Sequence, residues 1–186
     1  MYKRQELGEN GNALDHLSKS LQMIYAMKGE KSDSEEITTI LGNIARCHRA
    51  LGDAKKALSY PEDSLAIYRR ISGEDSKTES IAISLNNIAL CHNNLGEYQI
   101  ALKYNMDALT MFNTVHGENA NHPNIAMTLH NIGLCYEALK EYESALEFYQ
   151  KSLEMDYEIY GRDSNHPDIK SIERSNERCK QKRDSE

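Results

Sequence analysis

The sequence contains no Trp and only 3 Pro among its 186 residues, and none of its apolar runs approaches the roughly 20 residues needed to cross a bilayer. Scarce proline suits long helices, because a proline inside a helix removes a hydrogen bond and collides with the preceding turn. The first residues, MYKRQELGENGN, are polar and lack the apolar centre of a signal peptide. We therefore expect a helical protein of the cytoplasm, with no membrane segment.

Clustered basic charge is also missing. The formal net charge is −7, whereas nucleic-acid binding requires Lys and Arg gathered on one face. The sequence has no phosphate-binding G-x-x-x-x-G-K-S/T loop, no G-x-G-x-x-G fingerprint and no H-E-x-x-H zinc motif. It shows no arrangement of nucleophile, base and orienting group. We predict no nucleic-acid partner, no enzyme activity, no cofactor and no metal site.

An internal repeat organises the chain. It is seen in LGNIARCHRALGDAKKAL from Leu41, LNNIALCHNNLGEYQIAL from Leu85 and LHNIGLCYEALKEYESAL from Leu129, with a step of 44 residues. Matching columns continue to the glycines Gly73, Gly117 and Gly161. Positions one repeat apart are referred to below as a column.

Each repeat predicts two antiparallel helices, because its apolar residues recur at helical spacing on both sides of a Leu-Gly-Asp/Glu turn. The Asn-His-Pro sequences ending at Pro123 and Pro167 predict helix starts with proline in the first turn. The expected fold is all-α, a stack of helix-turn-helix repeats. We place full repeats at residues 35–73, 78–117 and 122–161, with a partial first repeat at 1–29 and a capping helix at 166–183.

The two ends depart from this pattern. Residues 1–29 align mainly with the second helix of a repeat, whereas residues 166–183 align with a first helix whose apolar columns are largely charged, as expected of a cap. A repeat that lacks its first helix exposes apolar surface. We therefore expect either self-association through the N-terminal repeat or a longer parent chain.

Cysteine and histidine fit the repeat better than they fit a chemical site. The four cysteines occupy one column, which predicts small buried thiols and no disulfide. They are Cys47, Cys91, Cys135 and Cys179. His48 and His92 share a column with Tyr136 and Lys180, so they begin no ligand series. His122 and His166 precede prolines at helix starts, which favours capping contacts.

The columns Leu-x-Asn-Ile-Ala/Gly-x-Cys, Leu-Gly-Glu-Tyr and Ala-Leu-x-Tyr resemble the tetratricopeptide repeat along nearly the whole chain. The long period and the His-Pro junction are similar to the kinesin light chain subclass. This resemblance implies that the repeats form a right-handed superhelical solenoid. It also implies a protein-interaction scaffold whose first helices line a concave groove that binds a peptide.

The resemblance also implies which residues line that groove. The Asn of the Asn-Ile motif would face or border it, with neighbours on the same helical face. An amide can both donate to and accept from a peptide backbone, but a repeated Asn can equally bond a neighbouring repeat, and both roles stay open. The predicted groove residues are Asn43, Arg46, Asn86, Asn87, Leu90, His130, Asn131, Leu134 and Arg178.

Arg46 and Arg178 add local positive charge to an acidic chain, which favours an acidic peptide. The leading hypothesis is thus an adaptor that binds a protein or peptide segment. The alternative is a structural or regulatory arm belonging to a larger, motor-associated or enzymatic protein.

Overall fold

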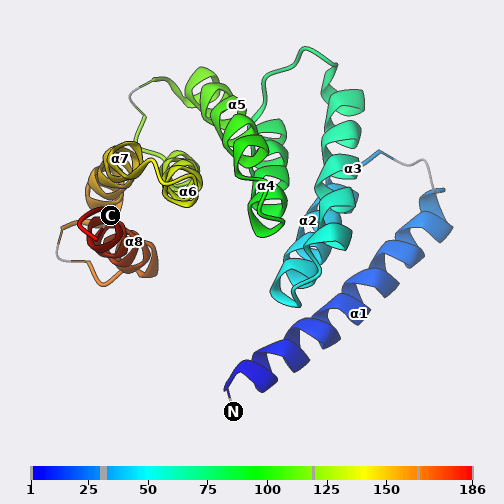
Figure 1. Ribbon diagram of the computed structural model, residues 1–186. Coiled ribbons are helices and arrows are strands. Elements are labelled where there is room, and N and C mark those ends of the chain that lie inside the picture. Colours follow the sequence, from blue (N-terminus) through cyan, green and yellow to red (C-terminus); the bar gives the residue numbers. More distant parts are fainter. Residues whose placement is uncertain (1, 30–32, 119, 163, 186) are drawn as a thin grey trace. The chain divides into compact units, whose positions relative to one another are not determined.

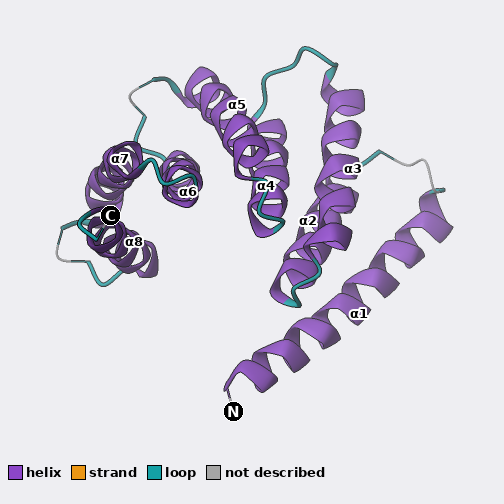
Figure 2. Cartoon of the chain, viewed as in Figure 1, coloured by secondary structure: helices purple, strands orange, loops and turns teal. Residues whose placement is uncertain are grey.

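The computed structural model describes residues 2–29, 33–118, 120–162 and 164–185, and these residues form helices joined by loops, without strands (Figure 1; Figure 2). The helices are α1 (Tyr2–Lys28), α2 (Glu35–Ala50), α3 (Ala54–Ser72), α4 (Glu79–Asn94), α5 (Tyr98–His116), α6 (Pro123–Ala138), α7 (Tyr142–Tyr160) and α8 (Pro167–Arg183). We call α2, α4, α6 and α8 first helices, and α1, α3, α5 and α7 second helices, after their place in the repeat.

The chain forms two compact units. Unit 1 comprises residues 1–76 with residues 94–96, and unit 2 comprises residues 77–93 with residues 97–186. In unit 1, α2 packs against both α1 and α3; in unit 2, α7 packs against both α6 and α8. Each unit is thus built from first and second helices in alternating contact.

The turn between α2 and α3 follows from its sequence. Gly52 has a φ of 83°, a left-handed conformation that glycine adopts without steric cost. Asp53 then caps α3, because its Oδ1 accepts a hydrogen bond from the Lys56 backbone N–H at 3.2 Å. In the corresponding turn between α6 and α7, Lys140 has a φ of 66°. A lysine thus occupies a left-handed backbone conformation that favours glycine.

The predicted His-Pro helix starts are confirmed. Helices α6 and α8 begin at Pro123 and Pro167. The N–H groups of the first helical turn have no partner within the helix, so the N–H that proline lacks costs no hydrogen bond there. The preceding His122 accepts a hydrogen bond at Nδ1 from the Asn124 backbone N–H at 3.2 Å, and His166 caps α8 in the same way. These histidines act as N-caps, as the sequence predicts.

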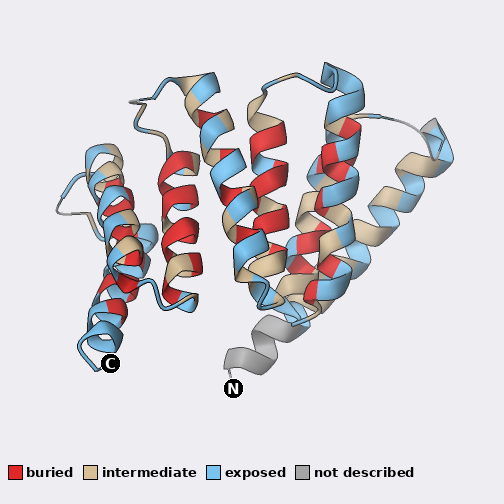
Figure 3. Cartoon of the chain, turned by 45° about the horizontal axis from the view of Figure 1, so that its top comes forward, coloured by how far each residue is buried: buried red, intermediate tan, exposed pale blue. Residues whose placement is uncertain are grey.

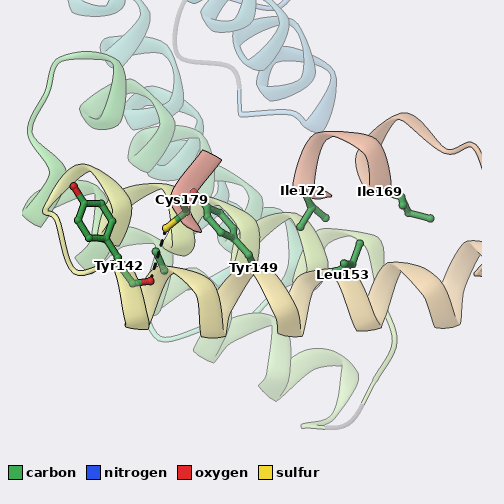
Figure 4. Packing of buried hydrophobic residues seen from close by; sticks show 7 residues of the cluster. Tyr142, Tyr149, Leu153, Ile169, Ile172 and Cys179 are labelled. Atoms are coloured by element: carbon green, nitrogen blue, oxygen red, sulfur yellow. Dashed lines mark hydrogen bonds between the residues drawn. The ribbon is translucent and has the colours of Figure 1, made fainter. Parts of the chain in front are cut away.

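Each unit has its own apolar core, and buried residues run along the facing sides of the helices (Figure 3). In unit 1, Ile37, Leu41 and Ile67 pack with partly buried side chains of α1 and α3. In unit 2 the core joins α7 to α8 (Figure 4). Its buried members are Tyr142, Ala145, Tyr149, Leu153, Ile169, Ile172 and Cys179.

Small residues let α6 and α7 approach closely. Ala145 is fully buried, and a Cβ added to Gly133 would lie 2.6 Å from two ring carbons of Tyr149 and 3.2 Å from the Ala145 carbonyl oxygen. The Tyr149 ring therefore occupies the space that any larger residue at position 133 would need. This contact sets the position of the Tyr149 hydroxyl, which becomes important below.

Gly52→Ala tests the left-handed turn. No atom lies within 4 Å of the added Cβ, so the cost should come from the backbone conformation alone. We expect the free energy of unfolding to fall by about 1–2 kcal/mol, measured by urea denaturation.

Gly42→Ala is the matched control. Gly42 lies in α2 of the same unit and also has open space around it, but its backbone is helical. Alanine there should raise the free energy of unfolding by about 0.5–1 kcal/mol. Equal effects of the two substitutions would contradict the assignment of strain to position 52.

Candidate functional site

Side-chain hydrogen bonds connect neighbouring first helices in unit 2. Asn86 of α4 donates through Nδ2 to Thr128 Oγ1 at 2.8 Å, and Asn131 of α6 donates through Nδ2 to Asn86 Oδ1 at 2.9 Å. One repeat further on, His130 of α6 hydrogen-bonds through Nε2 to Ser175 Oγ of α8 at 3.1 Å. Asn86 and Asn131 are buried, so their amides serve the contact between repeats.

The other two motif asparagines are placed differently. Asn43 of α2 and Asn87 of α4 are half-buried. Among the described residues, neither amide forms a side-chain hydrogen bond. Their donors and acceptors are therefore available to a ligand, whereas those of Asn86 and Asn131 are already used.

A buried carboxylate holds α6, α7 and α8 together. Glu137 of α6 has a side chain only 4% exposed, and it accepts from the Tyr149 hydroxyl at 2.7 Å. Arg178 of α8 donates to both its oxygens, through Nε and Nη2, at 2.8 Å each. Lys182 donates through Nζ at 3.0 Å. Four donor atoms thus satisfy this carboxylate, as a buried charge requires.

The same contacts set the proton affinities. Burial alone would raise the pKa of Glu137, but hydrogen bonds from Arg178, Tyr149 and Lys182 outweigh it and lower the pKa to about 2. The hydrogen bond to Glu137 raises the pKa of Arg178. Burial, followed by the bond to Glu137, raises the pKa of Tyr149. At neutral pH the site therefore holds one carboxylate, two cations and a neutral phenol.

A cleft of about 240 Å³ opens beside this cluster, lined by Asn93, Tyr98, Leu134, Glu137, Ala138, Arg178 and Lys182. The side chains of Arg178 and Lys182 are about half exposed even though both contact Glu137. Arg178 Nη1 and the remaining Lys182 protons make no hydrogen bond to the described residues, so they can bind an anionic group in the cleft.

Apolar side chains extend the cleft along the first helices. Leu134 lies two turns after Met127 on the same stripe of α6, and Leu90 lies two turns after Ile83 on the same stripe of α4. Met127 is 45% exposed and Ile83 39% exposed, while both leucines are half-buried. The exposed apolar surface therefore continues away from the charged cluster.

The structure thus brings part of the predicted site together. In unit 2, Leu134 and Arg178 line the cleft, whereas Asn87 and Leu90 lie on the neighbouring stripe of α4. Asn43 and Arg46 belong to unit 1, where Arg46 is exposed. The sequence analysis missed Glu137, Lys182, Ile83 and Met127; a signal existed only for Ile83 and Met127, two apolar residues in one column.

His130 is held neutral. It is largely buried, its ring lies tilted against Tyr149 at 5.5 Å, and burial followed by the nearby Arg178 charge lowers its pKa to about 4. A neutral imidazole bonded to Ser175 is a structural contact, so His130 adds neither charge nor an acid to the site at pH 7.

The four cysteines are free and buried, as predicted. Burial raises the pKa of Cys135 to about 11, even though Asn105 hydrogen-bonds to its sulfur, and burial likewise raises the pKa of Cys179. Thiols in this state are poor nucleophiles, because the thiolate is the reactive form. The column serves packing.

Within the described part of the chain, one group of three potential metal ligands lies close together: Glu79, His116 and His122, with ligand atoms within 4.8 Å of one another. The two imidazole rings are stacked 4.0 Å apart and only 15° from parallel. A metal must lie close to the plane of each ligating ring, about 2 Å from the nitrogen. The planes of two stacked, nearly parallel rings do not meet near their nitrogens, so His116 and His122 cannot share a metal in this arrangement. Tyr160 and His166 occupy the columns of His116 and His122 one repeat later, and their rings also stack, with centroids 3.7 Å apart. The stacked pair is therefore a structural contact at the loop between repeats.

The sequence matches the tetratricopeptide repeat (TPR) family over residues 36–114 and again over residues 80–158, which together cover more than half of the chain. The chain belongs to the tetratricopeptide repeat family. TPR arrays generally mediate protein–protein interactions and are typically non-enzymatic scaffolds. A comparison with curated proteins finds no match.

Solved TPR structures share the fold. A Podosopora anserina protein described as a kinesin light chain, with nearly identical TPR-like repeats, gives a TM-score of 0.71 at 18% identity, covering 97% of this chain and 82% of that one. A second crystal structure of it gives 0.69 with the same identity and coverage. BtubC (BKLC) from P. vanneervenii gives 0.70 at 20% identity, covering 98% and 74%. The predicted all-α TPR fold of kinesin light chain type is confirmed.

The helices of the described residues are 16 to 27 residues long and carry both polar and apolar side chains. None of those in the described residues carries a stretch long and apolar enough to cross a membrane.

Glu137→Gln tests the buried carboxylate. Glutamine keeps the size but leaves Arg178 and Lys182 without their charge partner, so we expect the free energy of unfolding at pH 7 to fall by about 1–2 kcal/mol. Because the folded pKa lies below its ordinary value of 4.5, this stabilisation is present above pH 4.5 and is lost as the pH falls towards 2. Denaturant titrations of both proteins at several pH values should therefore converge in acid; Glu158→Gln, at an exposed site on α7, should show no such trend.

Asp156→Asn should have the opposite pH dependence. Asp156 of α7 is buried, and burial, with the nearby Asp168 charge, raises its pKa from 3.8 to about 6 despite the opposing effect of His166. The folded state then binds the proton more tightly, so stability falls as the pH rises from about 4 to about 6. We expect the substitution to raise the free energy of unfolding at pH 7 by about 1–2 kcal/mol and to change little at pH 4.

Asp107→Asn, at an exposed site on α5, is the control for this measurement. A gain in stability from Asp156→Asn that is as large at pH 4 as at pH 7 would contradict the assigned ionisation.

Proposed function

We propose that the first-helix face of unit 2 binds an extended segment of a partner protein, with an acidic residue seated in the cleft beside Arg178 and Lys182. The observation that carries this proposal is the cleft itself. It combines half-exposed cations with the apolar surface of Leu134 and Ala138. A ligand with one acidic and one apolar side chain would fill both parts.

The charge of the site supports an acidic ligand. Two cations face one buried carboxylate, which leaves a local excess of one positive charge in a chain whose net charge is −7. Arg174, exposed one turn before Arg178 on α8, adds a further charge on the same side of the helix. Such a local positive surface attracts acidic segments and repels basic ones.

The neighbouring stripe supports binding of a peptide backbone. Asn87 offers a half-buried amide that can donate and accept, as main-chain groups require. Ile83, one turn before it on α4, and Met127 in the same column of α6 offer exposed apolar contacts. Asn43 and Arg46 occupy the matching columns of α2 and give unit 1 a similar surface. We therefore propose that the protein is a cytoplasmic adaptor without catalytic residues.

The test is a display screen of random and acidic peptides against the purified chain. We expect selected peptides to share acidic residues next to an apolar one. Lys182→Glu should then weaken their affinity at least about tenfold, measured by isothermal titration calorimetry, because it reverses a charge in the cleft but leaves the Arg178 pair with Glu137 in place.

Lys180→Glu provides a matched control. It makes the same charge change two residues away on α8, where the side chain points to another face of the helix and is exposed. Peptides that lose affinity equally with both variants would show a general charge effect and overturn the proposed cleft. Failure to select any shared motif would favour the array as a structural arm.

A further inference from the structure

The cleft beside Arg178 is lined by more hydrogen-bond donors than the cations alone provide. Asn93, near the end of α4, and Tyr98, at the start of α5, also line it, and both residues are half-buried. Among the described residues, neither of these two side chains forms a hydrogen bond. Side chains of α4, α5 and α8 therefore bring unused donors to one cleft of about 240 Å³.

The same cleft offers few acceptors. Glu137 is the one carboxylate among its lining residues, and its side chain is only 4% exposed. Both of its oxygens already accept hydrogen bonds. Oε1 accepts from Arg178 Nε and from Lys182, and Oε2 accepts from Arg178 Nη2 and from the Tyr149 hydroxyl. A ligand in this cleft therefore has to supply most of the acceptors.

The hydrogen bonds to Glu137 also fix the position of the Arg178 guanidinium. Its Nε and Nη2 atoms each lie 2.8 Å from a carboxylate oxygen, and these contacts hold the plane of the group. Because Nη1 belongs to a group that is already held, less conformational entropy is lost when it binds an anion. A planar guanidinium can donate to phosphate oxygens as well as to carboxylate oxygens.

The number of donors distinguishes between two kinds of anionic ligand group. A carboxylate has two oxygens, with about four acceptor positions in all. The protons of Arg178 Nη1 and the remaining protons of Lys182 would fill these positions, which leaves Asn93 and Tyr98 without a partner. A phosphate ester has a third strong acceptor oxygen. It can therefore also accept hydrogen bonds from the Asn93 amide and the Tyr98 hydroxyl.

The surrounding charge also matches a phosphate ester. At pH 7 a phosphorylated side chain carries a charge of about −1.5 to −2, whereas a carboxylate carries about −1. Arg178 and Lys182 outnumber Glu137, and the exposed Arg174 lies one turn before Arg178 on α8. Glu177 is next to Arg178 in the sequence, but it does not line the cleft. A second negative charge on the ligand therefore has a further cation nearby.

We propose that the acidic residue bound in this cleft is a phosphorylated residue of the partner protein. Its phosphate oxygens accept hydrogen bonds from four side chains, those of Asn93, Tyr98, Arg178 and Lys182. The assignment rests on the proposed function, because it names the chemical class of the residue that the same cleft binds. An Asp or Glu of a ligand enters the cleft with fewer hydrogen bonds and lower affinity.

The test compares peptide libraries that differ at one central position, which holds phosphoserine, phosphotyrosine, Glu or Ser. The intact chain selects sequences from each library, and every selected sequence is remade in all four forms for isothermal titration calorimetry. We expect a phosphorylated form to bind at least about tenfold more tightly than its Glu form, and the Ser form to bind most weakly. The two phosphorylated forms distinguish a short side chain from an aromatic one.

Tyr98→Phe tests the additional donors. It removes a hydroxyl that a phosphate uses and a carboxylate does not need, so the ratio of phosphopeptide affinity to Glu-peptide affinity should fall at least about threefold. Tyr104→Phe is the matched control, with the same change on α5. The Tyr104 ring is half-buried, stacks on His92 and does not line the cleft, so the ratio should stay the same.

The results separate the phosphate assignment from the proposed function. Glu forms that bind as tightly as both phosphorylated forms would overturn the assignment but leave the cleft as a site for an acidic residue. An affinity ratio that Tyr98→Phe leaves unchanged, or that Tyr104→Phe lowers equally, would overturn it in the same way. If peptides of none of the four forms bind, the proposed function fails together with the phosphate assignment.

Discussion

The arrangement of α6, α7 and α8 depends on the burial of one carboxylate. Removing Glu137 from water carries a large desolvation cost unless donors replace the lost solvent. Tyr149 supplies one from α7, and Arg178 and Lys182 supply three from α8. The Tyr149 hydroxyl can reach Glu137 only because Gly133 leaves room for the ring. Core packing and the charged cluster therefore constrain each other, and the same cations then face the cleft.

The repeat predicts the helices and turns well, because those features recur. Gly52 and the His-Pro helix starts are examples in which one local requirement fixes one residue type. The site is less predictable, since a column shows which positions are equivalent but not which side chains are already bonded. The amides of Asn86 and Asn131 are hydrogen-bonded to each other, whereas the Asn87 amide makes no side-chain hydrogen bond among the described residues. Glu137 was missed because its column holds Arg49, Asn93, Glu137 and Gln181, which leaves no periodic signal.

In some columns the residue type changes from repeat to repeat, but a flat ring is present each time. His48 stacks on Tyr60, His92 on Tyr104 and Tyr136 on Phe148, with centroids 5.5 Å apart in each pair. A flat ring near the end of the first helix is what the second helix requires, and both imidazole and phenol provide it. This explains in physical terms why histidine gives way to tyrosine without any loss of fold, and why these histidines form no ligand series.

The same reasoning distinguishes α8 from α1. On α8, Lys170 and Glu177 fill the columns that face a second helix elsewhere, and charged residues there are stable in water. On α1, the columns that face a first helix elsewhere keep Ala13, Leu17 and Ser20. Exposed apolar residues are common singly, but here Leu17 of α1 lines one groove together with Ile40 of α2.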